Sequence, residues 1–259
     1  MKAMILAAGL GTRLRPLTND RPKALVEVAG HALLGLTLMR LRAAEVHEVI
    51  INTHHYADMI LQYLEDNRNF DMRIEISREE VLLDTGGGLK KAAWFFREGA
   101  ADLSNPFIVH NVDVMSTIDL GQMMRFHLKH DALVTMAVQN RKTSRPLIFD
   151  EKGLFRGRYK ENGATEATNT ADANGPSVGS PQQWQRAAFS GIHILSPRIF
   201  SRITEDGVFS IIDSYIRLAS QGERIMAFDA DEYYWRDLGR PENVVQAARD
   251  IENGNYPGQ

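Results

Sequence analysis

The sequence contains no cysteine in its 259 residues. This absence excludes disulfides, thiolate catalysis and cysteine-ligated zinc, and it is compatible with a reducing compartment. Long apolar runs are missing as well. The short apolar stretch after Met1 and Lys2 leads directly into a glycine-rich loop without a signal-peptide core or cleavage site, and no later run reaches membrane-spanning length. We therefore expect a soluble, cytoplasmic protein without a membrane partner.

The sequence also lacks a strong excess of charge of either sign. The formal net charge is -3 and the isoelectric point is close to 6.2, so the protein as a whole is not attracted to nucleic acid or to an anionic membrane. A phosphate site would have to be a local concentration of positive charge, and its ligand is expected to be small. The eight histidines show no zinc or triad spacing, and His193, within an apolar strand, is expected to be structural.

Residues 6–25, with the sequence LAAGLGTRLRPLTNDRPKAL, form the most informative segment and follow an apolar N-terminal strand. Gly9 and Gly11 permit backbone conformations closed to other residues and let a ligand approach the main chain. The cationic side chains of the segment are Arg13, Arg15, Arg21 and Lys23. Because such cations can surround an anion, the segment predicts a polyphosphate site. It matches neither the dinucleotide fingerprint nor the P-loop, and a glycine turn with solvated arginines is the alternative.

The first half of the chain alternates strand-like and helix-like patterns. Strands are predicted at residues 3–6, 48–52, 73–77, 107–110 and 133–138, and helices at 33–44, 57–64, 88–96 and 120–129. This rhythm predicts βαβ units and an α/β fold, in which a mainly parallel central sheet is flanked by helices and ligands bind at the carboxyl ends of the strands.

The rhythm changes near residue 141, where a smaller β lobe is expected to begin. Residues 146–150 and 154–159 predict a hairpin. Residues 161–183 have almost no large apolar side chains, so we expect a loop or lid there. Further strands are predicted at 185–195, 224–229 and 233–236, and helices at 197–203, at 210–219 and from residue 241.

Three further groups of residues are candidates for chemistry. Thr85 precedes three glycines at a predicted helix start, so it is a candidate N-cap, and the glycine amides could hold a base or phosphate. Asp113 and Asp237 each follow an apolar strand. Two carboxylates are what Mg²⁺ commonly takes from a protein, with substrate phosphates and water completing its shell. A tight helix entry and ordinary turn-forming aspartates are the alternatives.

Together these segments resemble the sugar-1-phosphate nucleotidyltransferase family, also called nucleoside-diphosphate-sugar pyrophosphorylases. The resemblance rests on AAGLGTRLRPLT at residues 7–18 with Pro22 and Lys23, and it extends over nearly the whole chain. It implies a Rossmann-like, GT-A-like nucleotidyltransferase fold. Residues 1–259 would form a single domain, with a nucleotide-binding core at 1–140 and a sugar-binding lobe at 141–240.

The resemblance also implies roles for individual residues. Arg13 and Lys23 would be catalytic and hold the phosphates, and Asp113 and Asp237 would bind Mg²⁺. The nucleotide-binding residues would be Leu6, Ala7, Ala8, Gly9, Gly11, Thr12, Thr85, Gly86 and Gly87, and the sugar-binding residues Asn111 and Gly191. The family usually has Asn-Gly-Asp where this chain has Asn111-Val112-Asp113, so contacts that need a bare backbone at the middle residue are in question.

Within the family, residues 83–88 and 189–192 most resemble the uridylyltransferases of N-acetylmuramate 1-phosphate, which act in cell-wall recycling. The implied substrates are UTP and that sugar phosphate. Guanylyltransferases of mannose or heptose 1-phosphate, a cytidylyltransferase, and a silent paralogue that binds a nucleotide sugar remain alternatives. One of the cations Arg141, Lys142 and Arg145 is hypothesised to meet a substituent such as a lactyl carboxylate, with a solvated basic loop as the alternative. The sequence does not give the oligomeric state.

Overall fold

The computed structural model describes residues 1–98, 105–159, 165–167 and 184–256. Most of the predicted loop or lid at 161–183 lies outside these residues. In the part of the chain that is described, no helix is long and apolar enough to cross a membrane.

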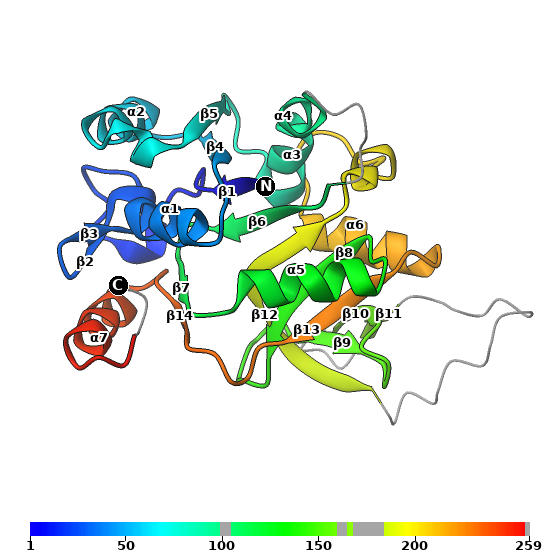
Figure 1. The fold of residues 1–259 in the computed structure, drawn as a ribbon. Helices are drawn as coiled ribbons and strands as arrows, with labels where there is room; N and C mark the ends of the chain where they lie inside the picture. Colours follow the sequence, from blue (N-terminus) through cyan, green and yellow to red (C-terminus); the bar gives the residue numbers. More distant parts are fainter. Residues whose placement is uncertain (99–104, 160–164, 168–183, 257–259) are drawn as a thin grey trace, which may run out of the picture.

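A single mixed sheet forms the centre of the molecule, with the strand order β11-β10-β9-β12-β6-β1-β4-β5 (Figure 1). Its strands are β1 (Lys2–Leu6), β4 (Glu48–Thr53), β5 (Arg73–Arg78), β6 (Phe107–Asn111), β8 (Val134–Gln139), β9 (Leu147–Phe149), β10 (Phe155–Tyr159), β11 (Thr165–Ala167), β12 (Gln185–Leu195) and β13 (Ile225–Asp229). Strands β1, β4, β5 and β6 run parallel. Strand β12 is antiparallel to β6, β8 and β9, and β13 pairs with β8 in parallel. The predicted α/β fold with a mainly parallel core is confirmed.

Helices cover both faces of this sheet. They are α1 (Leu33–Ala43), α2 (Ala57–Asp66), α3 (Asp84–Lys91), α4 (Ala93–Arg97), α5 (Leu120–Lys129), α6 (Ile211–Ser220) and α7 (Pro241–Glu252). Successive strand residues point to opposite faces, and Met4 and Ile5 are both fully buried, in two different apolar clusters. Helices α1, α2 and α5 contribute to the cluster of Ile5, and α3, α4 and α6 to the cluster of Met4. A strand buried on both sides accounts for the unbroken apolar run at the N-terminus.

Two short antiparallel pairs lie outside the main sheet. Strands β2 (Glu27–Val28) and β3 (His31–Ala32) form a small hairpin before α1. Strand β7 (Val114–Ser116) pairs with β14 (Trp235–Asp237), which comes from the far end of the chain (Figure 1). The second pairing matters most for function, because Asp113 directly precedes β7 and Asp237 ends β14.

Some predicted boundaries were wrong. The helix predicted at 88–96 is two helices, α3 and α4, and α3 already begins at Asp84. Thr85 therefore lies within the first turn of α3 and is not its N-cap. Residues Pro197–Ser201 form a 3₁₀ helix in place of the expected α-helix. The predicted hairpin at 146–159 is confirmed as β9 and β10.

Candidate active site

A cavity of about 490 Å³ opens at the carboxyl ends of β1, β4 and β6. The register of the sheet places Leu6 beside Asn52 on one side and beside Asn111 on the other. The residues that line the cavity are Leu6, Ala8, Gly9, Lys23, Asn52, Glu79, Leu82, Asp84, Thr85, Asn111, Asp113 and Val208. The predicted ligand edge of the sheet thus carries a cavity large enough for a small molecule.

The glycine loop shapes one wall of the cavity. Gly11 has a φ of 65°, in the left-handed region, and a Cβ atom there would lie 3.0 Å from Thr18 Cγ2 and 3.1 Å from Lys23 Cβ. Thr18 Oγ1 donates to the Gly11 carbonyl at 2.8 Å and closes the loop. A Cβ at Gly9 would meet no atom within 4 Å. Glycine is therefore needed at position 11 because Thr18 and Lys23 pack closely against the backbone there, whereas Gly9 leaves open space beside the cavity.

Two residues that the sequence analysis did not identify hold this loop against the start of α3. Asn52 Oδ1 accepts a hydrogen bond from the Ala7 amide at 2.7 Å, and Asn52 Nδ2 donates to Glu79 Oε1 at 2.8 Å. The second oxygen of Glu79 accepts from the Leu83 amide at 2.9 Å. Because its amide is already engaged, Ala7 offers no free donor to a nucleotide, and it does not line the cavity. A polar residue at the end of a buried strand, such as Asn52, was the signal available in the sequence.

The glycines after Thr85 serve close packing. A Cβ at Gly86 would lie 2.2 Å from the Phe209 ring, and one at Gly87 would lie 2.3 Å from the Gly207 carbonyl oxygen. The Gly86 amide donates to the Phe209 carbonyl at 3.0 Å, so this amide is not free to hold a base or phosphate. Thr85 lines the cavity, and its hydroxyl accepts from the Ile211 amide at 3.0 Å.

The two candidate metal ligands are brought together by the pairing of β7 with β14. Asp237 is in register with Val114, and the Leu238 amide donates to the Asp113 carbonyl at 2.7 Å. A Cβ atom at Gly239 would lie 2.9 Å from Asp237 Oδ1 and 3.4 Å from Asp113 Oδ2. The same point is 3.3 Å from Arg13 Nη2. The side chains of Arg13, Asp113 and Asp237 therefore converge on the backbone of Gly239.

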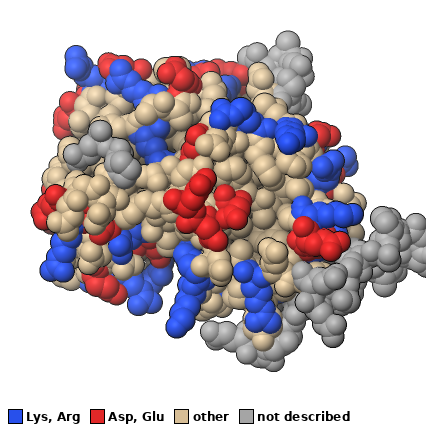
Figure 2. All heavy atoms as spheres, turned by 60° about the horizontal axis from the view of Figure 1, so that its bottom comes forward, with Lys and Arg blue, Asp and Glu red and all other residues tan. Residues whose placement is uncertain are grey.

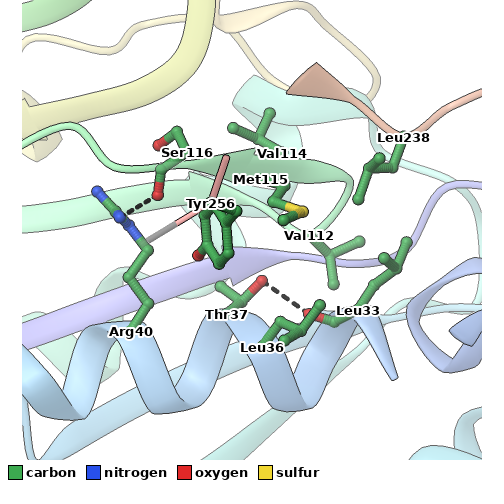
Figure 3. A pocket seen from close by; sticks show the side chains of 10 residues that line it. All are labelled: Leu33, Leu36, Thr37, Arg40, Val112, Val114, Met115, Ser116, Leu238 and Tyr256. Carbon is green, nitrogen blue, oxygen red and sulfur yellow. Dashed lines mark hydrogen bonds between the residues drawn. The ribbon is translucent and has the colours of Figure 1, made fainter. Parts of the chain in front are cut away.

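Apolar neighbours of these two acids, Val112, Val114 and Leu238, are buried. Figure 3 shows Val112, Val114 and Leu238 among the residues that line a small space. Its volume is about 10 Å³, close to the least that can hold one water molecule. The aromatic ring of Tyr256 enters the same space. Asp113 itself lies in the turn between β6 and β7 and lines the 490 Å³ cavity instead. Arg40 supports the segment by donating to the Ser116 and Ile118 carbonyls.

The predicted cations occupy different places. Lys23 lines the cavity and forms an ion pair with Asp113, and the two side chains are only 13% and 14% exposed. Arg13 reaches the point beside Gly239. Arg21 pairs with its exposed neighbour Asp20 at 3.1 Å, and Arg15 is exposed. Lys23 and Arg13 are thus the two cations of the loop that the structure brings to the carboxylates.

The chemistry of the carboxylates fits a hard divalent cation. Mg²⁺ prefers oxygen ligands and usually takes one or two carboxylates from protein. Within the described ranges, no group of three or more His, Cys, Asp or Glu side chains could hold a metal. A cation at Asp113 and Asp237 would therefore complete its coordination with ligand oxygens and water. The bare backbone at Gly239 keeps the space between the carboxylates clear.

The remaining predicted residues lie beside this site. Gly191 has a φ of 74°, and a Cβ there would lie 2.9 Å from Asn111 Nδ2 and 2.8 Å from Val114 Cγ2. The two candidate sugar-binding residues are therefore in contact. Thr12 is exposed at the start of the 3₁₀ turn Thr12–Leu14 and does not line the cavity.

Arg141 lies between β12 and β14. Its guanidinium carbon is 3.5 Å from the centre of the Trp235 ring, and Nη2 donates to the Phe189 carbonyl at 2.7 Å. Burial lowers the pKa of Arg141, and the Asp237 carboxylate opposes that change. Lys142 and Arg145 are exposed. Of the three cations that the sequence singled out, only Arg141 is held in a fixed place near the carboxylates.

The surface shows a mixed distribution of charge. On the face drawn in Figure 2, acidic side chains gather near the centre, with lysine and arginine side chains around them. A second hollow, of about 590 Å³, contains Asp150, Glu151, Asp229 and Asp231 in its wall. It shares no lining residue with the cavity at the carboxyl ends of the strands.

Comparisons with known proteins relate the chain to one family. Residues 2–149 match the nucleotidyl transferase family. The chain is 35% identical over 260 aligned positions to N-acetylmuramate alpha-1-phosphate uridylyltransferase of Caulobacter vibrioides, with 95% of this chain and 94% of that protein covered. It is 28% identical to mannose-1-phosphate guanylyltransferase of Mycobacterium tuberculosis, covering 98% of this chain but 66% of that longer protein.

A solved structure shows the same fold. HddC from Yersinia pseudotuberculosis, crystallised as a complex with GMP-PN, superposes with a TM-score of 0.72 at 24% identity. The superposition covers 96% of this chain and 99% of that one. The architecture of the described residues is therefore shared over nearly the full length of both chains.

Proposed function

This chain belongs to the nucleotidyl transferase family, and from that premise we propose that it transfers a nucleotidyl group from a nucleoside triphosphate to a sugar 1-phosphate, with release of pyrophosphate. We further propose that Mg²⁺ is required, that the nucleotide is UTP and that the sugar phosphate is N-acetylmuramate 1-phosphate. The observation that carries the proposal is the convergence of Arg13, Asp113 and Asp237 on the backbone of Gly239, with Lys23 on Asp113 at the cavity wall.

The reaction needs no protein base. A phosphate monoester is already largely ionised at neutral pH, because its second pKa is about 6. One of its oxygens can therefore attack the α-phosphorus directly, forming a new P–O bond as the bond to pyrophosphate breaks. The difficulty is to bring two anions together and to stabilise the departing one. Positioned cations supply both effects.

The residues of the site divide this work. Arg13, which reaches the carboxylates from the glycine loop, is suited to hold the leaving phosphates. Lys23 is paired with Asp113 and can exchange that carboxylate for a phosphate oxygen at the reacting centre. Asp113 and Asp237 would hold Mg²⁺, which when bound neutralises phosphate charge and orients the triphosphate. The open backbone at Gly9 leaves room for the nucleotide against the loop.

The choice of UTP and N-acetylmuramate 1-phosphate is supported by the 35% identity to the Caulobacter vibrioides enzyme, which extends over 94% of that protein. The guanylyltransferase from Mycobacterium tuberculosis is less similar, and this chain covers only 66% of it. A mannose- or heptose-1-phosphate guanylyltransferase therefore remains the second candidate.

A matrix assay of pyrophosphate release tests the proposal. The purified full chain is incubated with UTP, GTP, CTP or dTTP, each combined with N-acetylmuramate, N-acetylglucosamine, mannose or heptose 1-phosphate, with Mg²⁺ or with excess chelator. We expect the highest kcat/KM for UTP with N-acetylmuramate 1-phosphate, and none of this activity with chelator. A preference for GTP with mannose or heptose 1-phosphate would instead establish the second candidate. No release with any pair, despite thermal stabilisation by a nucleotide sugar, would indicate a silent binding protein.

A further inference from the structure

Arg141 is a cation that the proposed reaction does not use. It lies after β8, at the start of the region that the sequence assigns to sugar binding. Trp235 supports the flat face of its guanidinium at 3.5 Å, and Phe189 accepts one of its hydrogen bonds at 2.7 Å. Trp235 is itself fixed, because its Nε1 donates to the Ser190 carbonyl at 2.8 Å. The position of the charge is therefore set by two strands.

No carboxylate of the described residues forms an ion pair with this guanidinium. Two other partly buried arginines do have such partners: Arg156 pairs with Asp150 at 2.6 Å, and Arg236 pairs with Asp250 at 2.6 Å. The Nε atom of Arg141 is also buried without a hydrogen-bond partner in the part of the chain that the structure describes. The Asp237 carboxylate opposes the effect of burial on the pKa of Arg141 without forming an ion pair with it. A half-buried cation without an ion-pair partner is costly unless a ligand supplies one.

The location favours the sugar over the triphosphate. Arg141 is absent from the wall of the 490 Å³ cavity, which contains Lys23 and the glycine loop. Phe189, which accepts from Arg141, and Ser190, which accepts from Trp235, directly precede Gly191, and Gly191 lies against Asn111. Arg13 and Lys23 already face the carboxylates where the phosphates would lie. The remaining anion of the proposed substrate is the carboxylate on the lactyl substituent of its sugar ring.

We propose that Arg141 is the specificity-determining residue that binds a carboxylate on the sugar ring of the sugar 1-phosphate. The inference rests on the proposed function. A planar guanidinium can pair with a carboxylate through two parallel hydrogen bonds. Stacking on Trp235 orients that plane before the substrate arrives. A neutral sugar phosphate would leave the cation without its partner, and the enzyme would select against it.

The test compares two sugar phosphates of the same shape. N-acetylmuramate 1-phosphate and its lactyl primary amide differ in charge at the proposed contact. Affinity for each is measured by calorimetry in the presence of Mg²⁺ and a non-hydrolysable UTP analogue, and kcat/KM is measured with UTP. Wild type, Arg141→Gln and Arg141→Lys are compared, with Lys142→Gln as a control that removes a neighbouring exposed charge.

We expect wild type to prefer the acid over the amide by at least tenfold, because a hydrogen bond to a charged group is stronger than one to a neutral group. Arg141→Gln should abolish that preference by weakening the acid alone, with KM for UTP unchanged. Arg141→Lys should recover part of the preference, because it restores the charge without the planar fork. Lys142→Gln should behave as wild type. Melting temperatures of all variants are recorded. If Arg141→Gln is misfolded, the preference for acid over amide is compared between wild type and Arg141→Lys.

Equal use of acid and amide by wild type would overturn the inference. So would an Arg141→Gln variant that loses both ligands to the same extent, since Arg141 would then act on the phosphate or on packing. The wild-type enzyme could also turn over a different sugar phosphate and neither N-acetylmuramate 1-phosphate nor its amide. That result would contradict the proposed substrate, and the inference with it. These outcomes separate the two proposals.

Discussion

Lys23 and Asp113 are 90 residues apart in the sequence and form an ion pair at the wall of the cavity. Both side chains are mostly shielded from water, and each compensates the charge of the other. The pair joins the glycine loop to the end of β6. It is the contact through which the N-terminal loop reaches the candidate metal ligands.

Removal of either member of this pair is predicted to reduce turnover. Asp113→Asn and Lys23→Gln should each lower kcat for pyrophosphate release at least a hundredfold, on the order of the loss of one positioned electrostatic group. Asp58→Asn and Lys129→Gln, which alter exposed charges of the same kind, should stay within about threefold of wild type, the level expected of changes away from the site. Near-normal rates in both site variants would refute the assigned roles.

Gly239→Ala is predicted to disturb the site without unfolding the protein. The added Cβ would lie 2.9 Å from Asp237 Oδ1 and within 3.4 Å of atoms of Arg13 and Asp113. Displacing these side chains by a fraction of an ångström should lower kcat by about tenfold to a hundredfold. Assays of activity and of melting temperature distinguish this result from general instability. Wild-type kcat in the variant would show that these side chains need no fixed arrangement.

The sequence was sufficient to predict the features that depend on local pattern. The apolar run of β1 followed by glycines predicted the edge of the sheet where the cavity lies, and Asp113 and Asp237 were found because each follows an apolar strand. Their proximity depends on β7 pairing with β14. That pairing was not predicted, because short strands far apart in sequence carry no pattern that identifies their partner.

Other features depend on contacts that the sequence could not reveal. Gly86 and Gly87 were predicted to bind the nucleotide, and the sequence could not show that residues 207–209 also leave no room for a Cβ atom at either position. The Asn52 and Glu79 hydrogen bonds need two strands and a helix start to be in place. Arg141 was one of three equivalent cations until its stacking on Trp235 distinguished it.

Buried histidines predict a loss of stability in mild acid. Burial lowers the pKa of His110 and of His193 from 6.5 to about 3, and that of His127 to about 4. Between these values and 6.5 the unfolded chain binds protons that the folded chain does not. The stabilisation is therefore complete above pH 6.5 and is lost as pH falls towards the folded pKa. Each histidine should cost about 2 kcal/mol of unfolding free energy between pH 7.5 and pH 5.

Urea unfolding at pH 7.5 and at pH 5 checks this effect. In His193→Gln the difference in unfolding free energy between the two pH values should be smaller than in wild type by about 2 kcal/mol. His47→Gln replaces a side chain that is 59% exposed and should keep the full difference. An identical difference in His193→Gln and wild type would show that His193 does not contribute to the pH dependence.

Arg40 is predicted to stabilise the segment that carries Asp113. It donates to the carbonyl of Ser116 (Figure 3) and to that of Ile118, and Arg40→Ala would leave both carbonyls without this donor. We expect a loss of about 3 kcal/mol of unfolding free energy, measured by chemical denaturation. The neighbouring Arg42 pairs with Asp71 at 3.0 Å, with side chains 50% and 61% exposed. Arg42→Ala should change stability by about 0.5 kcal/mol or less, and equal effects of the two variants would contradict the role of Arg40.

The most direct test of the account is a crystal structure of the full chain with Mn²⁺, which replaces Mg²⁺ and gives an anomalous signal, together with a non-hydrolysable UTP analogue. The account predicts an anomalous peak between Asp113 and Asp237, about 2.1 Å from an oxygen of each, as expected for a small octahedral cation. Lys23 and Arg13 should contact the phosphates of the same nucleotide. A peak bound by neither aspartate, or a nucleotide whose phosphates lie away from Lys23, would contradict the central claim.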